Sequence, residues 1–247
     1  MKKLSLIILF GIILSNAIFA NEEQSPFELE VTQGWRQDKL SASAIHKKFP
    51  VKGKASLKNI NIYETRVRAR LNMGNWFLRA DGGYGEIKKS TGKLSVLGFH
   101  ANHDIMGGMT RDAKVSFGRD FFLNSRTTLS PMIGYLYGEE KINTDYSRYI
   151  KVPLRWHAPF VGLRFATRPG ENWLLYGEYN FACAPLKKIK GYGNIGVVGL
   201  GYNITRNLMV KAEYEYSDIQ VHITRFNIKG HAKLISKTAR LVLSYAF

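Results

Sequence analysis

The chain has 247 residues, a formal net charge of +17 and 45% hydrophobic residues, yet its mean hydropathy is only -0.19. After the first apolar run, which ends at Phe19, no stretch approaches the roughly 20 apolar residues that a membrane-spanning helix requires, which excludes a helical membrane protein. The length fits one domain. The single cysteine, Cys183, excludes an intramolecular disulfide, and we expect it to be a small apolar side chain on a strand.

Residues 1–20 have the layout of a secretory signal peptide. A cationic start, Met1 to Lys3, precedes the apolar run from Leu4 to Phe19, and Ala20 is a small residue ahead of a polar segment. We therefore expect residues 1–20 to be a signal peptide and residues 21–247 to be a single exported domain, which the strand pattern below identifies as a β-barrel. Cleavage after Ala17 and an uncleaved anchor are the alternatives.

The rest of the chain alternates apolar and polar residues, as strands with one apolar face do. Leu208, Val210 and Ala212 share one face, whereas Lys211 and Glu213 share the other. Repeated strands of about 10 residues with this alternation are typical of a transmembrane barrel. We predict strands near residues 26–38, 59–73, 75–88, 111–124, 127–139, 156–168, 172–185, 193–204, 207–221 and 236–247. The predicted fold class is therefore all-β, an antiparallel up-and-down transmembrane β-barrel of about ten strands.

The connections between these strands are of two kinds. Tight polar turns are expected near residues 72–75, 124–126, 168–172 and 205–207, and longer loops near residues 39–58, 89–110, 140–155, 186–192 and 222–235. In outer-membrane barrels short turns face the periplasm, so both termini are expected there. Near the strand ends we expect four tryptophans in interfacial girdles, Trp35, Trp76, Trp156 and Trp173. A soluble β-sandwich or a lipocalin-like barrel, which would bury its apolar face inside, is the structural alternative.

The two-residue period assigns acidic and basic side chains to the barrel interior in equal numbers. The acids are Glu28, Glu30, Glu64, Asp81, Asp112, Asp120, Glu178, Glu213 and Glu215, and the bases are Arg36, Arg66, Arg68, Arg70, Arg79, Lys114, Arg164, Lys211 and Arg240. Unpaired charges are costly at low dielectric, so we expect a lumen occluded by ion pairs. The alternative is a small anion-favouring pore with Arg66, Arg68 and Arg70 as its selectivity element.

The surplus positive charge lies in the predicted outer loops. The lysines expected to bind anions there are Lys47, Lys48, Lys52, Lys54, Lys88, Lys89, Lys187, Lys188, Lys190, Lys229 and Lys233. Clustered cations concentrate polyanions near a surface. We expect lipopolysaccharide phosphate or a host sulfated glycan as the partner, in a structural or adhesive role, and no nucleic acid because no stacking platform is evident.

Other motifs are expected to carry no chemistry. Gly191, Gly193 and Gly196 match a dinucleotide fingerprint but lead into a strand rather than a helix. His100, His103 and Asp104 lack a nearby further ligand. We expect no metal, no cofactor and no enzymatic activity.

The segment from Leu241 to Phe247 alternates apolar residues and carries Tyr245 and Phe247 on one face. This ending resembles the signal by which bacterial outer-membrane barrels are passed to the barrel assembly machinery. The resemblance implies a location in the bacterial outer membrane and an assembly role for Tyr245 and Phe247.

A ten-stranded barrel with long outer loops is similar to the omptin family, whose members are surface proteases with an aspartate pair facing an aspartate–histidine pair. Here Asp104 beside His103 has no paired acid, and Asp218 and His222 are the nearest acid–histidine couple. We therefore carry over the topology without catalysis, and an omptin-like surface protease is the alternative function. The segment from Glu64 to Ile87, with an arginine-rich inner face and an Asn–Trp turn, also resembles outer-membrane proteins of environmental chlamydiae, some of which are considered porins.

Overall fold

The computed structural model of the chain describes residues 25–46, 52–88, 90–96, 99–144, 152–186, 189–225 and 228–247. These residues form β1 (Phe27–His46), β2 (Lys52–Met73), β3 (Trp76–Ile87), β4 (Ser90–Val96), β5 (Phe99–Arg119), β6 (Phe121–Asn124), β7 (Thr127–Thr144), β8 (Val152–Thr167), β9 (Trp173–Leu186), β10 (Ile189–Asn203), β11 (Leu208–Arg225) and β12 (Ile228–Ala246). In this part of the chain no helix is long and apolar enough to cross a membrane.

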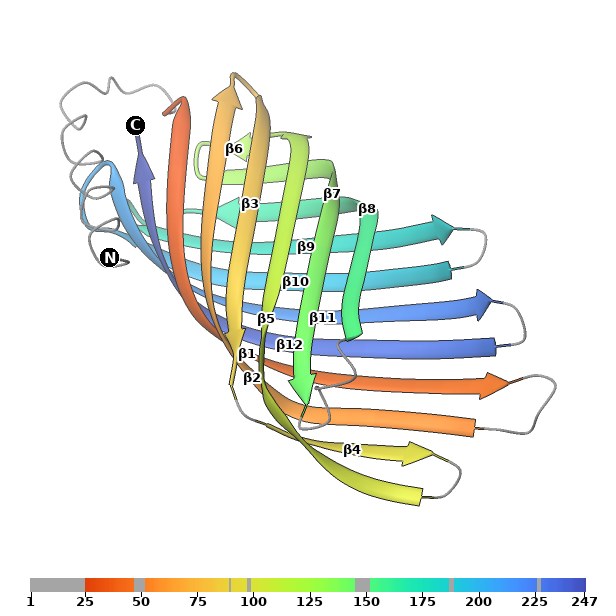
Figure 1. Cartoon of the computed structure of the whole chain (residues 1–247). Coiled ribbons are helices and arrows are strands. Elements are labelled where there is room, and N and C mark those ends of the chain that lie inside the picture. Colours follow the sequence, from red (N-terminus) through yellow and green to blue (C-terminus); the bar gives the residue numbers. More distant parts are fainter. Residues whose placement is uncertain are drawn as a thin grey trace.

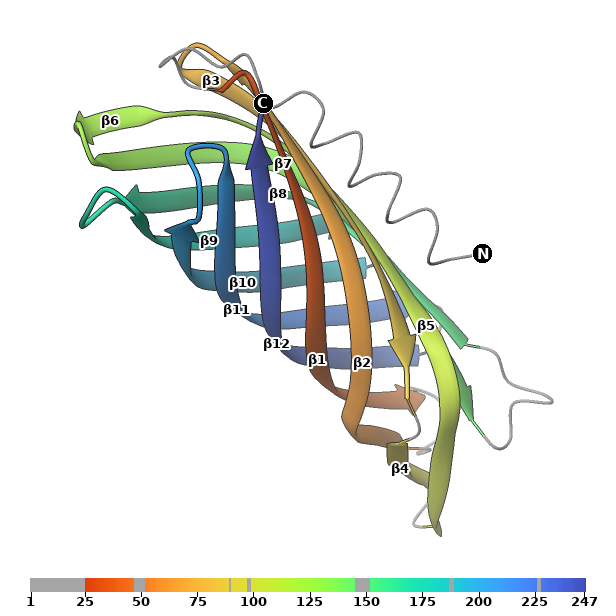
Figure 2. The same cartoon turned by 90° about the vertical axis from the view of Figure 1, so that its left-hand side faces the viewer.

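All the strands belong to one antiparallel sheet that closes on itself (Figure 1). β1 pairs with β2 on one side and with β12 on the other, and Figure 2 shows these three strands side by side. β4 continues β3, since both pair with β2 and β5. β6 likewise continues β5 along β7. The twelve segments therefore form ten barrel strands, which confirms the predicted fold class and strand number.

One end of the barrel, called the turn end below, carries the tight connections. β2 leads into β3 through Gly74, whose φ of +63° suits glycine, and the other short turns join β6 to β7, β8 to β9 and β10 to β11. Phe27 and Phe247 also lie at this end, where the amide of Phe247 donates to the carbonyl oxygen of Phe27 at 2.9 Å. The tight turns occur where the alternation predicts them.

The opposite, or loop, end differs from the prediction of long loops. β1 continues to His46, β5 begins at Phe99, and β11 continues to Arg225, so most of the segments predicted as loops are strands. Alternation disappears where both faces of a hairpin are in water, but the backbone ladder does not need it. The sequence pattern therefore marked only the part of each strand that has an apolar face.

A belt of exposed apolar side chains surrounds the barrel near the turn end. It includes Val67, Leu71, Val115, Ile133, Val161, Leu163, Leu175, Val198, Leu200 and Leu241. Trp35, Trp76 and Trp173 are each close to half exposed and lie in this belt as predicted. The girdle prediction is wrong for Trp156, which faces the lumen and packs against a buried cluster, because it shares the inner face of β8 with Ala158 and Phe160. Outward-facing apolar side chains are what a bilayer requires.

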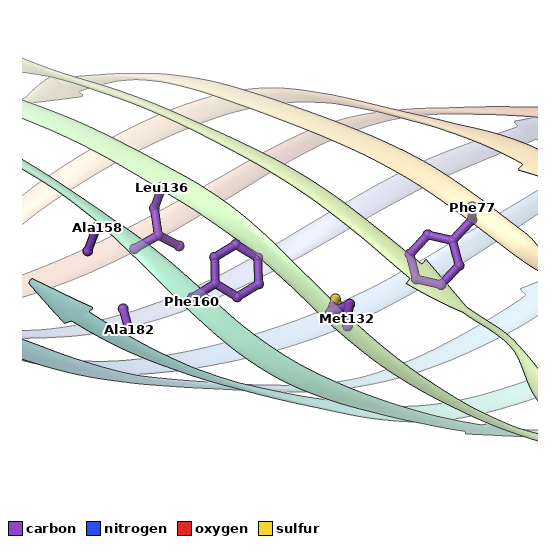
Figure 3. Close-up of a cluster of buried hydrophobic side chains, with 6 residues drawn as sticks. All are labelled: Phe77, Met132, Leu136, Ala158, Phe160 and Ala182. Carbon is purple, nitrogen blue, oxygen red and sulfur yellow. The ribbon is translucent and has the colours of Figure 1, made fainter.

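Two small hydrophobic clusters lie inside the barrel. One contains Phe77, Met132, Leu136, Ala158, Phe160 and Ala182 (Figure 3). The other contains Ile60, Ile62, Ile87 and Ile142. Between and below these clusters the interior is polar, and its largest feature is a network of charged side chains.

Candidate functional site in the charged lumen

Charged groups from opposite walls meet in the middle of the lumen. Arg79 on β3 donates two hydrogen bonds of 2.7 Å to the two carboxylate oxygens of Glu178 on β9. Lys114 on β5 approaches the same carboxylate at 2.6 Å, and Asn180 donates to it at 2.8 Å. A bidentate arginine pair fixes both distance and orientation, so these bonds tie β3 and β5 to β9 across the lumen.

A second group of bonds connects β2 with β3, β5 and β11. Arg66 contacts Asp81 at 2.9 Å and also pairs with Asp112. Arg68 approaches Asp81 at 3.2 Å and Glu213 at 3.1 Å, and it also pairs with Glu30. Because each of these guanidinium groups contacts at least two carboxylates, neither is an unpaired positive charge facing the lumen.

Apart from Arg164, the remaining predicted lumen residues have partners as well. Arg240 pairs with Glu64 and lies 2.7 Å from Glu215. Lys211 lies 2.9 Å from Glu28 and also pairs with Glu30, and Arg70 pairs with Asp120. The structure thus places Glu64, Arg66, Arg68, Arg70, Arg79, Asp81, Lys211, Glu213, Glu215 and Arg240 in one set of lumen ion pairs.

Arg164 on β8 is different from the other lumen bases. Its guanidinium carbon lies 4.9 Å from the centre of the Tyr176 ring. Its Nε atom is buried, and among the described residues it has no hydrogen-bond partner. In the described part of the chain no carboxylate forms an ion pair with it.

Sequence reasoning missed an acidic pair near the loop end. Asp38 on β1 and Glu140 on β7 are both buried, and both contact the guanidinium group of Arg36. The predicted strands ended at residues 38 and 139, so Glu140 was placed in a loop. The continued strand β7 puts Glu140 inside, and Asp38 shares the inner face of β1 with Arg36. The two residues add two acids to the predicted interior balance.

Glu140 should make the stability of the loop end depend on pH. It lies beyond the outward-facing Tyr137, and burial raises its pKa to about 7, with Asp38 adding to the rise and Arg36 opposing it. The contribution of Glu140 to the free energy of unfolding is fully present below the ordinary carboxyl pKa of 4.5, and it is lost as the pH rises through about 7. We expect Glu140→Gln to reduce the loss of stability between pH 5 and pH 8, measured as the urea midpoint of the folded form at each pH.

The exposed Glu86, which pairs with Lys88 at 3.2 Å, supplies the control for this experiment. Glu86→Gln should leave the pH dependence of the parent unchanged because both partners are solvated. An equal pH dependence in the parent and in Glu140→Gln would contradict the assignment.

The predicted anion-binding lysines differ in their surroundings. Lys54, Lys88 and Lys229 are exposed, and Lys233 forms a 2.8 Å ion pair with Asp218. Lys52 and Lys190 lie on β2 and β10. Lys47, Lys48, Lys89, Lys187 and Lys188 lie outside the described residues.

The structure adds two lysines to this group. Lys39 and Lys237 are exposed and lie on neighbouring strands, since Lys39 pairs with Ile235 and Lys237 pairs with Gln37 in the β1–β12 register. We define the basic flank as Lys39, Lys54, Lys229, Lys233 and Lys237. Lys237 is two residues from Ala239, which pairs with the belt residue Trp35, so the basic flank begins directly above the apolar belt.

Residues considered for catalysis or metal binding show other contacts. The His222 ring lies 4.5 Å from that of His231, and Asp218 is engaged by Lys233. Among the described residues no group of three or more His, Cys, Asp or Glu side chains is arranged to hold a metal ion. His100, His103 and Asp104 lie on β5.

A cavity of about 90 Å³ lies above and beside the ion pairs. Its lining is mostly charged, with Arg79, Glu178 and Glu213 among the members, and it also includes apolar side chains such as Leu136 and Trp156. Arg164 also lines it. The arrangement offers one guanidinium group without an ion pair among the described residues and apolar side chains within one space.

Comparison with known proteins agrees with this architecture. The structure is similar to that of the outer membrane protease OmpT from Escherichia coli, with a TM-score of 0.61 and 13% identity over 93% of this chain and 99% of that chain. The translocator domain of the autotransporter NalP from Neisseria meningitidis follows, with a TM-score of 0.47 and 13% identity over 100% of this chain and 97% of that one. At such identity the likeness to OmpT shows the fold, which confirms the resemblance to omptin topology. No curated protein matches the sequence.

A family model described as Protochlamydia outer membrane protein matches residues 30–193, which is more than half of the chain and includes the arginine-rich β2 and β3. This match confirms the resemblance to outer-membrane proteins of environmental chlamydiae. The chain therefore belongs to the family of Protochlamydia outer membrane proteins and is a β-barrel of the bacterial outer membrane.

Proposed function

We propose that this barrel has a lumen closed to ions and uses its basic flank to bind lipopolysaccharide phosphate at the outer surface of the membrane. The observation that carries the proposal is the position of the flank, which begins beside the belt residue Trp35 through the Gln37–Lys237 and Trp35–Ala239 pairs. Lipid phosphates lie at this level, just beyond the hydrocarbon region. The orientation implied has the turn end and both termini in the periplasm, where the barrel assembly machinery meets the chain.

Closure of the lumen is supported by bonds that join opposite walls. Arg79 and Glu178 come from β3 and β9, and Arg68 and Glu213 come from β2 and β11. An ion would have to break such pairs in order to pass, and a buried charge left without its partner is costly. The rival proposal, an anion-favouring porin, needs a row of free arginines, whereas Arg66, Arg68 and Arg70 each contact a carboxylate.

Lipopolysaccharide fits the basic flank better than a sulfated glycan does. Lys39 and Lys237 project from the side wall of the barrel, since they share the outward face of their strands with Trp35 and Leu241. A soluble polymer would meet the tips of the hairpins first, whereas phosphates of the surrounding lipid meet the wall. OmpT is a protease, but we propose a binding role rather than hydrolysis because Asp218 is already engaged by Lys233.

Replacing Lys39, Lys229 and Lys237 together with glutamine should weaken lipopolysaccharide binding by the refolded protein. Each lysine near an anionic surface contributes about 1 kcal/mol, so the loss should be on the order of 100-fold and should shrink as salt rises. Binding of labelled lipopolysaccharide and of heparin, measured side by side at several salt concentrations, tests this.

The matched control replaces Arg126 and Arg206, two exposed turn-end residues, with glutamine and should leave binding intact. Loss of heparin binding with retention of lipopolysaccharide binding would replace the proposal by an adhesin for sulfated glycans. Unchanged binding of both ligands would show that the basic flank is not a binding surface.

A further inference from the structure

One seam of the barrel is shorter than its neighbours. β8 pairs with β9 only from Thr167–Leu175 to Phe160–Ala182, whereas β8 stays paired with β7 up to Val152. Among the described residues the two strands form no further pairs toward the loop end. Figure 1 shows the reason, because the outer part of β8 turns with β7 while β9 continues alongside β10. Pro159, the first residue beyond the last pair, has no amide hydrogen to offer, which is typical of an edge strand.

The side chains around this seam leave space inside the barrel. Trp156 and Phe160 pair with Gly138 and Gly134 on β7, and their rings lie where side chains of those glycines would be. Both rings therefore lie against β7 and away from β9. The opposite side is lined by the small residues Ala158, Ala182, Gly191 and Gly193, which leave a pocket of about 40 Å³. Figure 3 shows Ala158 and Ala182 beside Phe160 and Leu136 in the same cluster.

The same seam is bordered by an apolar groove on the outer face of the barrel. The groove measures about 710 Å³, and its lining includes Pro159, Val161, Phe181 and Cys183. Val161 and Phe181 are exposed belt residues, so this groove faces the lipid in a membrane. Phe160 lines the groove and packs in the inner cluster with Ala158 and Ala182, which line the pocket, so this side chain lies between the two spaces.

On its inner side the pocket adjoins the lumen cavity. Leu136, Trp156 and Ile195 line both, and the lumen cavity reaches Arg164. Arg164 and Phe160 share one face of β8, four residues apart, which is about 13 Å along a strand. That distance is within the length of a common acyl chain. The groove, the pocket and the cavity thus lie one after another between the lipid and Arg164, the one lumen base without a carboxylate ion pair among the described residues.

We propose that the β8–β9 seam is a lateral port through which the lumen binds a single-chain anionic amphiphile of the fatty-acid class. The carboxylate of the amphiphile lies at Arg164, whose guanidinium group compensates the negative charge of the ligand inside the barrel. The acyl chain lies in the apolar pocket and leaves through the seam into the lipid-facing groove, so it stays out of water along its length. The ion-paired floor excludes a second route toward the turn end.

A protein with Trp156 as its only tryptophan tests this proposal. Replacing the three belt residues Trp35, Trp76 and Trp173 with phenylalanine leaves one fluorophore, on the wall shared by pocket and cavity. In liposomes, a dibromo fatty acid should quench Trp156, whereas a dibromo phosphatidylcholine, confined to the surrounding lipid, should quench it far less. Equal quenching by both lipids would show that Trp156 senses only surrounding lipid and would overturn the port.

Two further variants separate the pocket from the head-group site. Ala182→Phe fills the pocket and should abolish quenching by the acid, while the matched control Ala212→Phe, on the exposed face of β11, should not. Arg164→Gln should raise roughly tenfold the concentration of acid that half-quenches Trp156. It should leave quenching by the corresponding dibromo fatty alcohol unchanged. Heat-modifiable migration confirms that each variant is folded. Undiminished quenching in Ala182→Phe would overturn the port, and equal losses for acid and alcohol in Arg164→Gln would overturn the carboxylate assignment.

Discussion

Replacing Phe247 with aspartate is expected to leave most of the protein exported but not inserted into the outer membrane. The Phe247 ring lies 5.5 Å from the ring of Phe27 and 4.8 Å from that of Tyr245. Its amide donates to Phe27 at 2.9 Å, and its carbonyl oxygen accepts from the Ser25 hydroxyl. The change therefore affects both the proposed assembly signal and the strand pair that closes the barrel. Heat-modifiable migration of membrane fractions measures it.

A control separates the signal from the cost of a charge in the apolar belt. Phe122→Asp places the same charge on a side chain that is 49% exposed near the turn end but outside the closing strand pair. Its insertion should be close to normal, since charges near the membrane interface cost only about 1 kcal/mol or less. Normal insertion of Phe247→Asp, or an equal defect in Phe122→Asp, would contradict a signal role for Phe247.

Glu213→Ala should destabilise the folded barrel. The buried carboxylate of Glu213 lies 3.1 Å from Arg68 and accepts a hydrogen bond from the Tyr176 hydroxyl. Its removal takes one of three carboxylate partners from Arg68 and leaves the buried Tyr176 hydroxyl without its acceptor, which costs roughly 2 kcal/mol. The control Glu86→Ala removes an exposed partner of Lys88 and should cost about 1 kcal/mol at most. Urea unfolding of the refolded proteins measures both.

The same variant tests whether the lumen is closed. In planar bilayers the unmodified protein should show little steady conductance, and Glu213→Ala should show brief openings because a bond between opposite walls is lost. Stable anion-selective openings in the unmodified protein would favour the porin alternative. Equal stability of Glu213→Ala and the parent would show that the network contributes little.

How far the sequence could predict the lumen is clear from two residues. Glu213 lies in the alternating segment from Leu208 to Tyr216, so its inward position could be read directly. Glu140 lies beyond the apolar belt, where both faces of the hairpin are polar, and alternation carries no signal there. Its place beside Arg36 and Asp38 depends on how far β1 and β7 continue.

Trp156 shows the same limit for an aromatic residue. Near a predicted strand end it looked like the girdle residues Trp35, Trp76 and Trp173, because composition does not say which face a residue occupies. In the structure it covers Gly138 inside the barrel. A tryptophan opposite a glycine on a neighbouring strand could have suggested this, but only once the register between β7 and β8 was known.

The sequence by itself determined the barrel, its ten strands and its turn end, because a bilayer on one face and a polar lumen on the other impose a two-residue period on every spanning segment. Only the tertiary structure decided which charges are paired and which is left over at Arg164. It also decided that β8 and β9 separate beyond Phe160 and Ala182. Such features depend on register and on strand curvature, which bring together residues from distant parts of the chain and leave no local pattern.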